Sequence, residues 1–200
     1  MVVLNVESRK EIKRILDNDG IIAFPTDTVY GVGCLYDSVI GLEKIKRAKG
    51  RSDSKPIPCM VANADLINTI AKVNDLEKKC IEKFLPGPLT IVLDVKSDLD
   101  KNVTNGFDTI AVRIPDHDIA LKILEIANKP MLVTSANLSD TPSKLNSEDV
   151  IDDLGKFLDG IVLGKSTGKK ASTIIKIFNN DVVILREGLI GKEEVKECLK

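Results

Sequence analysis

The feature that most constrains this chain is the stretch Ile21 to Cys34, IIAFPTDTVYGVGC. It opens with consecutive apolar residues, a run that suits a strand covered on both faces. Pro25 ends the run because a proline has no N–H to donate to a neighbouring strand. Polar side chains and two glycines follow at once. The stretch predicts a buried strand that ends in a polar loop, with the rest of the fold arranged around it.

The loop after this strand has two interpretations. In the first it is a ligand site, because loops at strand ends often bind ligands and glycines let the backbone approach them closely. In the second it is the turn of a hairpin whose threonines hydrogen-bond their own backbone. The residues concerned are Thr26, Asp27, Thr28, Tyr30, Gly31 and Gly33.

Length and composition indicate the class of protein. The chain has 200 residues, 43% of them hydrophobic, and a mean hydropathy of +0.02. We expect a single domain over residues 1–200, with no separate C-terminal domain. No apolar run approaches the roughly 20 residues of a membrane span, and the N-terminus does not resemble a secretory signal. We therefore expect a cytoplasmic protein that makes no membrane contact.

Cysteine and histidine usage excludes several common kinds of site. The four cysteines form no C-x-x-C pair, which argues against a zinc cluster, and no metal site is expected. The single histidine, His117, argues against a Ser-His-Asp hydrolase, and its context PDHD predicts a structural role at a helix start. The net charge is −1, so any attraction for phosphate or RNA must come from local clusters of cations.

The most informative cationic segment is KRAKGRSDSKP, residues 46–56. A loop gathers such cations into one place, and lysine beside an arginine fork suits a polyphosphate, although the spacing is not that of a P-loop. The alternative is a solvent-exposed helix end whose cations complement the helix dipole. The cations are Lys46, Arg47, Lys49, Arg51 and Lys55.

Two further features point to a shared pocket. Arg113 lies in the apolar strand TIAVRI, and a buried arginine needs a partner, either a carboxylate of this protein or one of a substrate. The strand 130–134 runs into SANLSDTPS, a second junction between a strand and a polar loop, with Ser135, Asn137 and Ser139. Two such junctions and a cationic loop predict that they converge on one pocket.

Apolar periodicity predicts irregularly alternating strands and helices, with a Ser8–Glu11 capping box at the first helix. One hairpin is expected across Asn179 to Asp181, so we predict a mixed sheet with helices packed against it. The segment GKSTGKKAST is either a flap on the phosphate side or a flexible linker. The expected strands are 2–6, 21–24, 57–62, 89–95, 109–114, 130–134, 160–163, 172–178 and 182–186. The expected helices are 38–48, 64–71, 76–84, 119–127 and 147–154, after a first helix that stops at Gly20.

Seven short motifs occur in order along the chain: FPTDTVYGVG, AKGR, LPGPLTIVL, VRIPDH, TSANLS, STI and LREG. Together, from about Ile21 to Gly188, they resemble the YrdC-like family of threonylcarbamoyl-AMP synthases. The resemblance implies an α/β (α+β) fold of the YrdC/RibB-like kind, a strongly twisted mixed sheet with flanking helices around a basic cavity. It also implies a nucleotidyltransferase that makes threonylcarbamoyl-adenylate and pyrophosphate from L-threonine, bicarbonate and ATP. This is the first step toward threonylcarbamoyladenosine (t6A) in tRNA.

The same resemblance implies roles for individual residues. Lys49 and Arg51 match cations that hold ATP phosphates, and they are the expected catalytic residues because they oppose charge on the leaving pyrophosphate. Mg²⁺ is expected with the ATP, and no organic cofactor is expected. The other positions matched to ATP binding are Lys55, Ser135, Asn137, Ser172 and Arg186. Those matched to threonine binding are Thr26, Tyr30, Met60, Arg113 and Thr134.

Two of these positions depart from the family pattern, since Met60 stands where many relatives have a histidine and Lys55 replaces a frequent asparagine. The expected partners are ATP, L-threonine, bicarbonate and a downstream tRNA-modifying transferase complex, with RNA as a further candidate contact. Two alternative functions are an RNA-binding module that uses the same basic cavity and a paralogous carbamoyl-transfer enzyme of the same fold. The scarcity of aromatic residues argues against the first. Two residue pairs of the family pattern, Lys49 with Arg51 (K-x-R) and Ser135 with Asn137 (S-x-N), are preserved and argue against the second.

Overall fold

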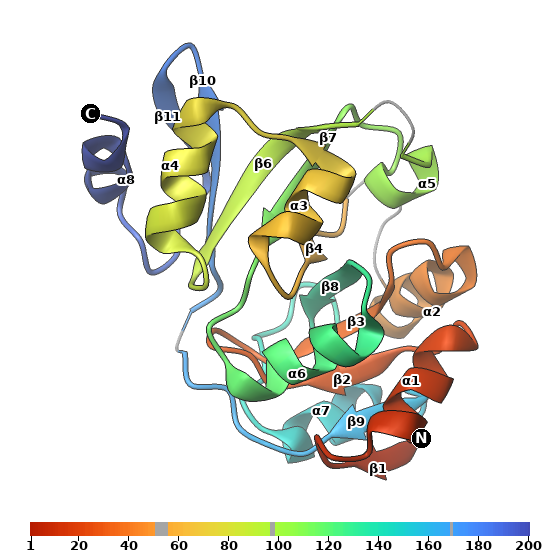
Figure 1. The fold of residues 1–200 in the computed structure, drawn as a ribbon. Coiled ribbons are helices and arrows are strands. Elements are labelled where there is room, and N and C mark those ends of the chain that lie inside the picture. The colour runs from red at the N-terminus through yellow and green to blue at the C-terminus, as the bar shows by residue number, and fades with distance from the viewer. Residues whose placement is uncertain (51–55, 97–98, 169) are drawn as a thin grey trace.

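The computed structural model describes residues 1–50, 56–96, 99–168 and 170–200, which form strands and helices in irregular alternation (Figure 1). The strands are β1 (Val2–Leu4), β2 (Ile22–Phe24), β3 (Gly31–Leu35), β4 (Cys59–Met60), β5 (Ala71–Lys72), β6 (Leu89–Val95), β7 (Thr109–Arg113), β8 (Met131–Ser135), β9 (Gly160–Val162), β10 (Thr173–Phe178) and β11 (Asp181–Arg186). The helices are α1 (Arg9–Asp17), α2 (Val39–Lys49), α3 (Ala64–Ile70), α4 (Asp75–Phe84), α5 (Lys101–Thr104), α6 (Asp118–Ala127), α7 (Ser147–Leu154) and α8 (Lys192–Leu199).

The strands join into one mixed sheet. Their order is β1-β9-β2-β3-β8-β4-β7-β6-β10-β11, and β5 also pairs with β6. Parallel pairs such as β2–β9 and β6–β10 occur beside antiparallel ones such as β2–β3 and β6–β7. The sheet is strongly twisted, so that β2 lies across the view in Figure 1 while β10 runs up it. The predicted twisted mixed sheet is therefore confirmed.

Helices cover two faces of this sheet and enclose two hydrophobic cores. Alternate residues of β2 point to opposite faces, with Ile22 in one core and Ala23 in the other. The first core contains residues of α1 and α6, such as Ile12 and Ile123. The second contains residues of α2, α3, α4, α7 and α8, such as Ile45. Because β2 is buried on both sides, the loop that follows it is held in place by both cores.

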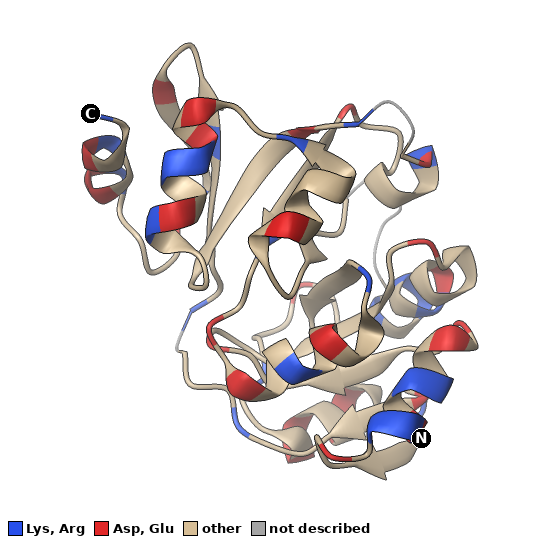
Figure 2. Ribbon diagram, in the orientation of Figure 1, with Lys and Arg blue, Asp and Glu red and all other residues tan. Residues whose placement is uncertain are grey.

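Charged side chains of both signs are interspersed over the helices that face solvent (Figure 2). Most of the ion pairs join exposed groups, for example Lys13 with Asp17 in α1. Such pairs contribute little to stability, about 1 kcal/mol or less each. The two cores, rather than surface charge, therefore provide most of the stability.

The predicted capping box at Ser8 and Glu11 is wrong. Ser8 is the N-cap of α1 but makes no side-chain capping bond, and its hydroxyl is turned toward Asn5 instead, where it accepts from the backbone N–H (3.4 Å) and donates to Oδ1 (3.3 Å). The Glu11 carboxylate accepts hydrogen bonds from Arg14 instead. A capping box does form at α4. The Asn74 side chain accepts from the backbone N–H of Glu77, and the Glu77 side chain accepts from the backbone N–H of Asn74.

The described part of the cationic segment is a helix end, the second of the two interpretations that the sequence left open. Helix α2 continues to Lys49, so Lys46, Arg47 and Lys49 lie in its last turn. Cations in the last turn of a helix interact favourably with the negative end of its dipole. Arg51 and Lys55 lie outside the described residues. The sequence also gave no sign of β5, α5 or α8, which are short or carry few apolar positions.

The polar loop after β2 is shorter than predicted, because Gly31 and Gly33 belong to β3. This strand pairs antiparallel with β2, as the hairpin interpretation expects, and also with β8. Glycine is required at position 33 by close packing. A Cβ there would lie 2.8 Å from Val133 Cγ2 and 2.9 Å from Leu132 O.

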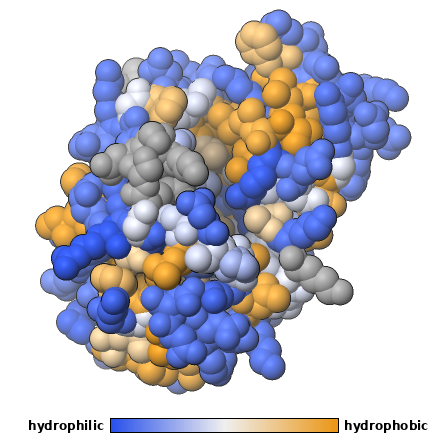
Figure 3. Space-filling view, turned by 180° about the vertical axis from the view of Figure 1, so that it is seen from behind, coloured by the Kyte–Doolittle hydropathy of each residue, from blue (hydrophilic) through white to orange (hydrophobic). Residues whose placement is uncertain are grey.

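At the β11 edge, one face of the sheet is turned outward. Val182 is buried, whereas Val183 and Leu185 are exposed, as the alternation of a strand requires. Figure 3 shows apolar side chains gathered at this end of the molecule. A register shift between Ile174 and Ile175 interrupts this alternation and places Arg186 opposite Ile174, and both residues line the cavity described below.

Replacing Gly33 by alanine tests the packing of β3 on β8. We expect Gly33→Ala to lower the free energy of unfolding by about 1–3 kcal/mol, because the Leu132 carbonyl cannot move without disturbing the ladder. Gly191→Ala is the control, since no atom lies within 4 Å of a Cβ built there, and its expected loss is below about 1 kcal/mol. Urea denaturation followed by circular dichroism measures both variants. Equal stability of Gly33→Ala and the unmodified protein would contradict this packing.

Candidate functional site

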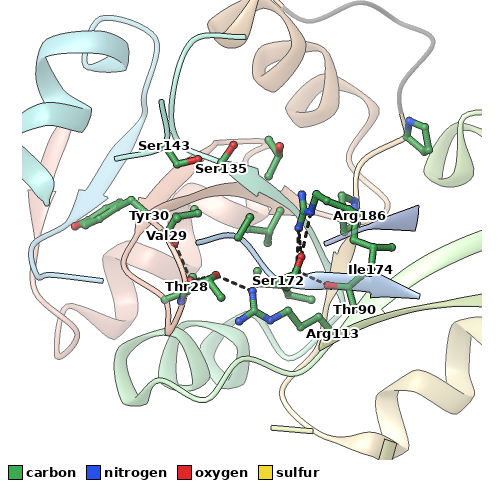
Figure 4. Close-up of a pocket in the computed structure, with 18 residues that line it drawn as sticks. Thr28, Val29, Tyr30, Thr90, Arg113, Ser135, Ser143, Ser172, Ile174 and Arg186 are labelled. Atoms are coloured by element: carbon green, nitrogen blue, oxygen red, sulfur yellow. Dashed lines mark hydrogen bonds between the residues drawn. The ribbon is translucent and has the colours of Figure 1, made fainter. Parts of the chain in front are cut away.

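A cavity of about 230 Å³ lies between the two halves of the sheet (Figure 4). Residues of β3 and β8 line one side, and residues of β6, β7, β10 and β11 line the other. Among the described lining residues, only Arg113 and Arg186 are charged. The other lining residues include seven with hydroxyl side chains of serine or threonine: Thr26, Thr28, Thr90, Thr134, Ser135, Ser143 and Ser172.

The loop between β2 and β3 is held by its own threonines. Thr26 Oγ1 donates to Val29 O (2.7 Å) and accepts from Thr28 N (3.1 Å). This is the self-satisfied turn of the hairpin interpretation. Thr26 and Thr28 nevertheless line the cavity, as the ligand-site interpretation expects. The two interpretations are compatible, because bonds inside the turn place its hydroxyls at the cavity wall.

Arg113 is buried at the end of β7, and its side chain is hydrogen-bonded on several sides. Nη2 donates to both carboxylate oxygens of Asp27 (2.6 Å each), Nη1 to Thr28 Oγ1 (2.8 Å) and Nε to Gly87 O (3.0 Å). Burial lowers the pKa of Arg113, and the Asp27 charge opposes that effect. Of the two partners that the sequence left open, the structure shows a carboxylate of this protein.

Arg186, at the end of β11, lines the same side of the cavity as Arg113. Nε and Nη2 donate to Ser172 O (3.0 and 2.8 Å), and Nη2 also donates to Ser172 Oγ (3.0 Å). Ser172 Oγ lies 2.7 Å from Thr90 Oγ1. Desolvation, and then the positive charge of Arg113, lower the pKa of Arg186. Among the described residues no carboxylate forms an ion pair with Arg186, so its charge is not compensated there.

Lys49 is buried behind Ser135, at the end of β8. Its ammonium donates to Ser135 O and to Asn137 O (2.6 Å) and lies 3.5 Å from Asn137 Oδ1. Asn137 Nδ2 in turn donates to Leu138 O (2.7 Å) and Thr141 O (2.8 Å). Lys49 therefore ties the end of α2 to the loop after β8. Neither Lys49 nor Asn137 lines the cavity itself.

The segment before β10 packs against the loop after β2. Thr26 N donates to Ser166 Oγ (3.1 Å), and Thr167 N donates to Thr26 O (3.3 Å). A Cβ at Gly168 would lie 2.6 Å from Asp27 O, so the two backbones approach more closely than a side chain permits. In this structure residues 164–168 form a strap across the loop, and residue 169 lies outside the described residues.

Two of the residues matched to threonine binding contribute mainly apolar surface. Tyr30 is buried, its hydroxyl donates to Val162 O in β9, and burial raises its pKa. Met60 ends β4 beside Arg113 and is also buried. A thioether accepts hydrogen bonds only weakly, so Met60 shapes this end of the cavity rather than supplying a polar contact.

The structure gathers most of the predicted site residues. Lys49 and Asn137 stand behind the cavity wall, and Arg51 and Lys55 lie outside the described residues. Their assignment to threonine or ATP stays a prediction. The predicted residues that line the cavity are Thr26, Tyr30, Met60, Arg113, Thr134, Ser135, Ser172 and Arg186.

Sequence reasoning left some of the polar wall unassigned. Thr28 and Thr90 line the cavity, and Asp27 is the ion-pair partner of Arg113. The signal for Thr90 was its position as a hydroxyl inside the apolar strand LTIVLDV. The signal for Asp27 was its place as the carboxylate of PTDTVYG, within the motif that also supplies Thr26.

The described helices are all too short or too polar to cross a membrane. In the same residues, no group of three or more His, Cys, Asp or Glu side chains is arranged to hold a metal ion.

Comparison with known proteins agrees with this geometry. Residues 14–188 match the Sua5/YciO/YrdC family, which carries the description "Telomere recombination". This chain belongs to the Sua5/YciO/YrdC family. The match extends from α1 to just beyond Arg186, so it includes every described residue of the cavity wall.

Individual members of the Sua5/YciO/YrdC family are similar over nearly the whole chain. The threonylcarbamoyl-AMP synthase of Bacillus subtilis is 36% identical over 188 residues, which are 92% of this chain and 54% of that protein. A relative from Methanocaldococcus jannaschii is 36% identical over 200 residues, 98% of this chain and 94% of that protein. The crystal structure of Pyrococcus abyssi Sua5 complexed with L-threonine superposes with a TM-score of 0.92 at 31% identity and covers 99% of this chain and 61% of that one. The chain thus spans little more than half the length of some relatives.

Removing Arg113 tests the buried ion pair. We expect Arg113→Gln to lower the free energy of unfolding by about 3–5 kcal/mol, because it leaves the Asp27 carboxylate buried without its cation. Lys129→Gln is the control, since it breaks a 2.7 Å pair with Asp37 that is about half exposed and should cost about 1 kcal/mol or less. Chemical denaturation at neutral pH measures both variants. Similar losses for the two would show that the Arg113 pair is no more important than a surface pair.

Proposed function

We propose that this protein is an L-threonylcarbamoyladenylate synthase, which makes threonylcarbamoyl-AMP and pyrophosphate from L-threonine, bicarbonate and ATP. The observation that carries the proposal is the cavity in which Arg113 and Arg186 are set among hydroxyl groups. Family membership, the name of the Bacillus subtilis relative and the threonine complex of the Pyrococcus abyssi protein support it.

The reaction needs no side-chain nucleophile. The threonine nitrogen bonds to the carbon of bicarbonate and water leaves, which gives an N-carboxylate. An oxygen of this carboxylate then bonds to the α-phosphorus of ATP, and the bond to the pyrophosphate oxygen breaks. The protein has to position the reactants and stabilise negative charge on the leaving group. Fixed hydroxyl and guanidinium donors suit that task better than a histidine or a cysteine would.

We assign the surroundings of Arg113 and those of Arg186, here called the Arg113 wall and the Arg186 wall, to the two larger substrates. L-Threonine is placed at the Arg113 wall, with Thr26, Tyr30, Met60 and Thr134. ATP is placed at the Arg186 wall, with Ser135 and Ser172, because an arginine whose charge is not compensated attracts phosphate. Lys49, Arg51, Lys55 and Asn137 are proposed to serve the phosphates. Lys49 also supports the ATP wall through its contacts with Ser135 and Asn137.

Mg²⁺ enters this scheme with ATP. The ion commonly keeps several waters and binds through substrate phosphates and one or two carboxylates. The described lining residues of the cavity carry no carboxylate, which fits a metal held mainly by the phosphates themselves. When bound there, Mg²⁺ supplies charge neutralisation on the pyrophosphate, and we propose no organic cofactor.

The product implies a receiver. A carbamate–phosphate mixed anhydride reacts readily with water, so we propose that a tRNA-modifying transferase complex in the cytoplasm consumes it. This places the reaction at the first step toward threonylcarbamoyladenosine in tRNA.

Pyrophosphate release tests the activity directly. The assay contains purified protein, Mg²⁺, ATP and bicarbonate, with L-threonine, L-serine or no amino acid. We expect release that depends on threonine, because only an amino acid with the correct side chain fits the part of the cavity beside Arg113. Release that is equal with every addition, or absent throughout, would contradict the proposal.

A substitution at Lys49 tests the role of that residue. We expect Lys49→Met to lower kcat for pyrophosphate release by about a hundredfold. The substitution removes a cation and also the hydrogen bonds that hold Ser135 and Asn137 in place. Lys44→Met is the matched control on the same helix, since Lys44 pairs with Asp159 at the surface (3.0 Å), away from the cavity. Unchanged release by Lys49→Met would remove Lys49 from the mechanism.

A further inference from the structure

The scheme above gives no role to Asp27, although this carboxylate is bonded to an arginine of the cavity. Both of its oxygens accept from Arg113 Nη2 at 2.6 Å. Arg113 lines the cavity and Asp27 does not. Asp27 therefore stands behind the guanidinium, on the side away from the space that a ligand would fill.

Contacts on its own loop and on the strap hold Asp27 in this place. Its side chain is only 9% exposed. Its carbonyl accepts from Thr167 Oγ1 (3.4 Å), and Gly168 packs directly on it. The bond from Thr26 Oγ1 to Val29 O closes the turn around it. A movement of Asp27 away from Arg113 is thus opposed by the turn and by the strap.

The two walls of the cavity consequently differ in charge. Arg113 and Asp27 form a neutral pair, and the bonds to Asp27, Thr28 and Gly87 leave Arg113 one N–H, on Nη1, for a ligand. Arg186 donates to the neutral oxygens of Ser172 and keeps its full charge. A neutral pair suits a zwitterion, whose own charges cancel, whereas a phosphate anion is drawn to the wall with excess positive charge.

We propose that Asp27 determines which substrate each wall accepts, because it cancels the charge of Arg113 and so keeps phosphate groups out of the amino-acid half of the cavity. The identities of the two ligands rest on the proposed function. Asp27 touches neither ligand and acts through Arg113, so it is a positioning residue rather than a catalytic one. Its effect is on selectivity between an amino acid and a phosphate.

Asp27→Asn tests this role, because it removes the charge and keeps an oxygen that accepts from Arg113. Isothermal titration calorimetry measures the Kd of inorganic pyrophosphate alone and with saturating L-threonine. For the unmodified protein we expect the two ligands to bind together, with a change in Kd below about twofold. For Asp27→Asn we expect pyrophosphate to bind about tenfold more tightly and to compete with threonine. In the activity assay, the variant should raise KM for threonine more than it lowers kcat.

Two further variants separate charge from structure. Asp37→Asn makes the same change in charge at the surface pair with Lys129 and should leave pyrophosphate binding unchanged. The double variant Asp27→Asn with Arg113→Gln removes both charges, so its affinity for pyrophosphate should return to that of the unmodified protein. Thermal melts by circular dichroism establish that each variant is folded.

Several results would overturn the inference. Competition between pyrophosphate and threonine in the unmodified protein would show that Asp27 does not separate the ligands, and this result needs no variant. Unchanged pyrophosphate affinity in folded Asp27→Asn, or a gain that persists in the double variant, would overturn it as well. If the unmodified protein binds no threonine, the proposed function fails and the inference fails with it. If the unmodified protein binds threonine and Asp27→Asn leaves the affinity for pyrophosphate unchanged, the proposed role of Asp27 is overturned and the proposed function is not.

Discussion

The buried contact between Arg113 and Asp27 is the constraint on which the site depends. A guanidinium out of water is costly unless its donors meet acceptors, and here the acceptors come from separate parts of the chain. Asp27 and Thr28 belong to the loop after β2, and Gly87 belongs to the turn before β6. To satisfy one side chain on β7, the protein has to bring that loop and that turn together. The cavity is the space that remains in front of them.

The elements that the sequence predicted best are those whose own apolar pattern is enough to define a strand or a helix. The expected strand 89–95 and helix 147–154 coincide with β6 and α7, because each carries a strong apolar pattern of its own. Strand β3 was implied only by the hairpin interpretation, because glycines usually indicate a loop. Its glycines are required by close packing against Val133, which lies on β8 and is remote in sequence. The capping box at Ser8 failed for a local reason, since the hydroxyl is held by Asn5, which offers it both a donor N–H and an acceptor Oδ1.

The site was predictable in its residue types more than in its contacts. Motif order brought out the hydroxyl residues and both arginines, and the structure places most of them around one cavity. The partner of Arg113 was left open, because nothing in one sequence says which carboxylate will lie beside it. The burial of Lys49 was equally hidden, since its acceptors are mostly backbone carbonyls that every residue possesses. Contacts of that kind become visible only with the topology.

The strand order also bears on how the protein is synthesised. β2 is bordered on one side by β3, which follows it closely, and on the other by β9, which is made much later. During translation from the N-terminus, the apolar residues Ile22 and Phe24 therefore have no partner strand on this side until residues 160–162 have been made. Pairings between distant segments form slowly, and unpaired apolar strands favour aggregation in the meantime. Because Arg186 comes later still, a ribosome-bound chain has no complete cavity until residue 186 has emerged.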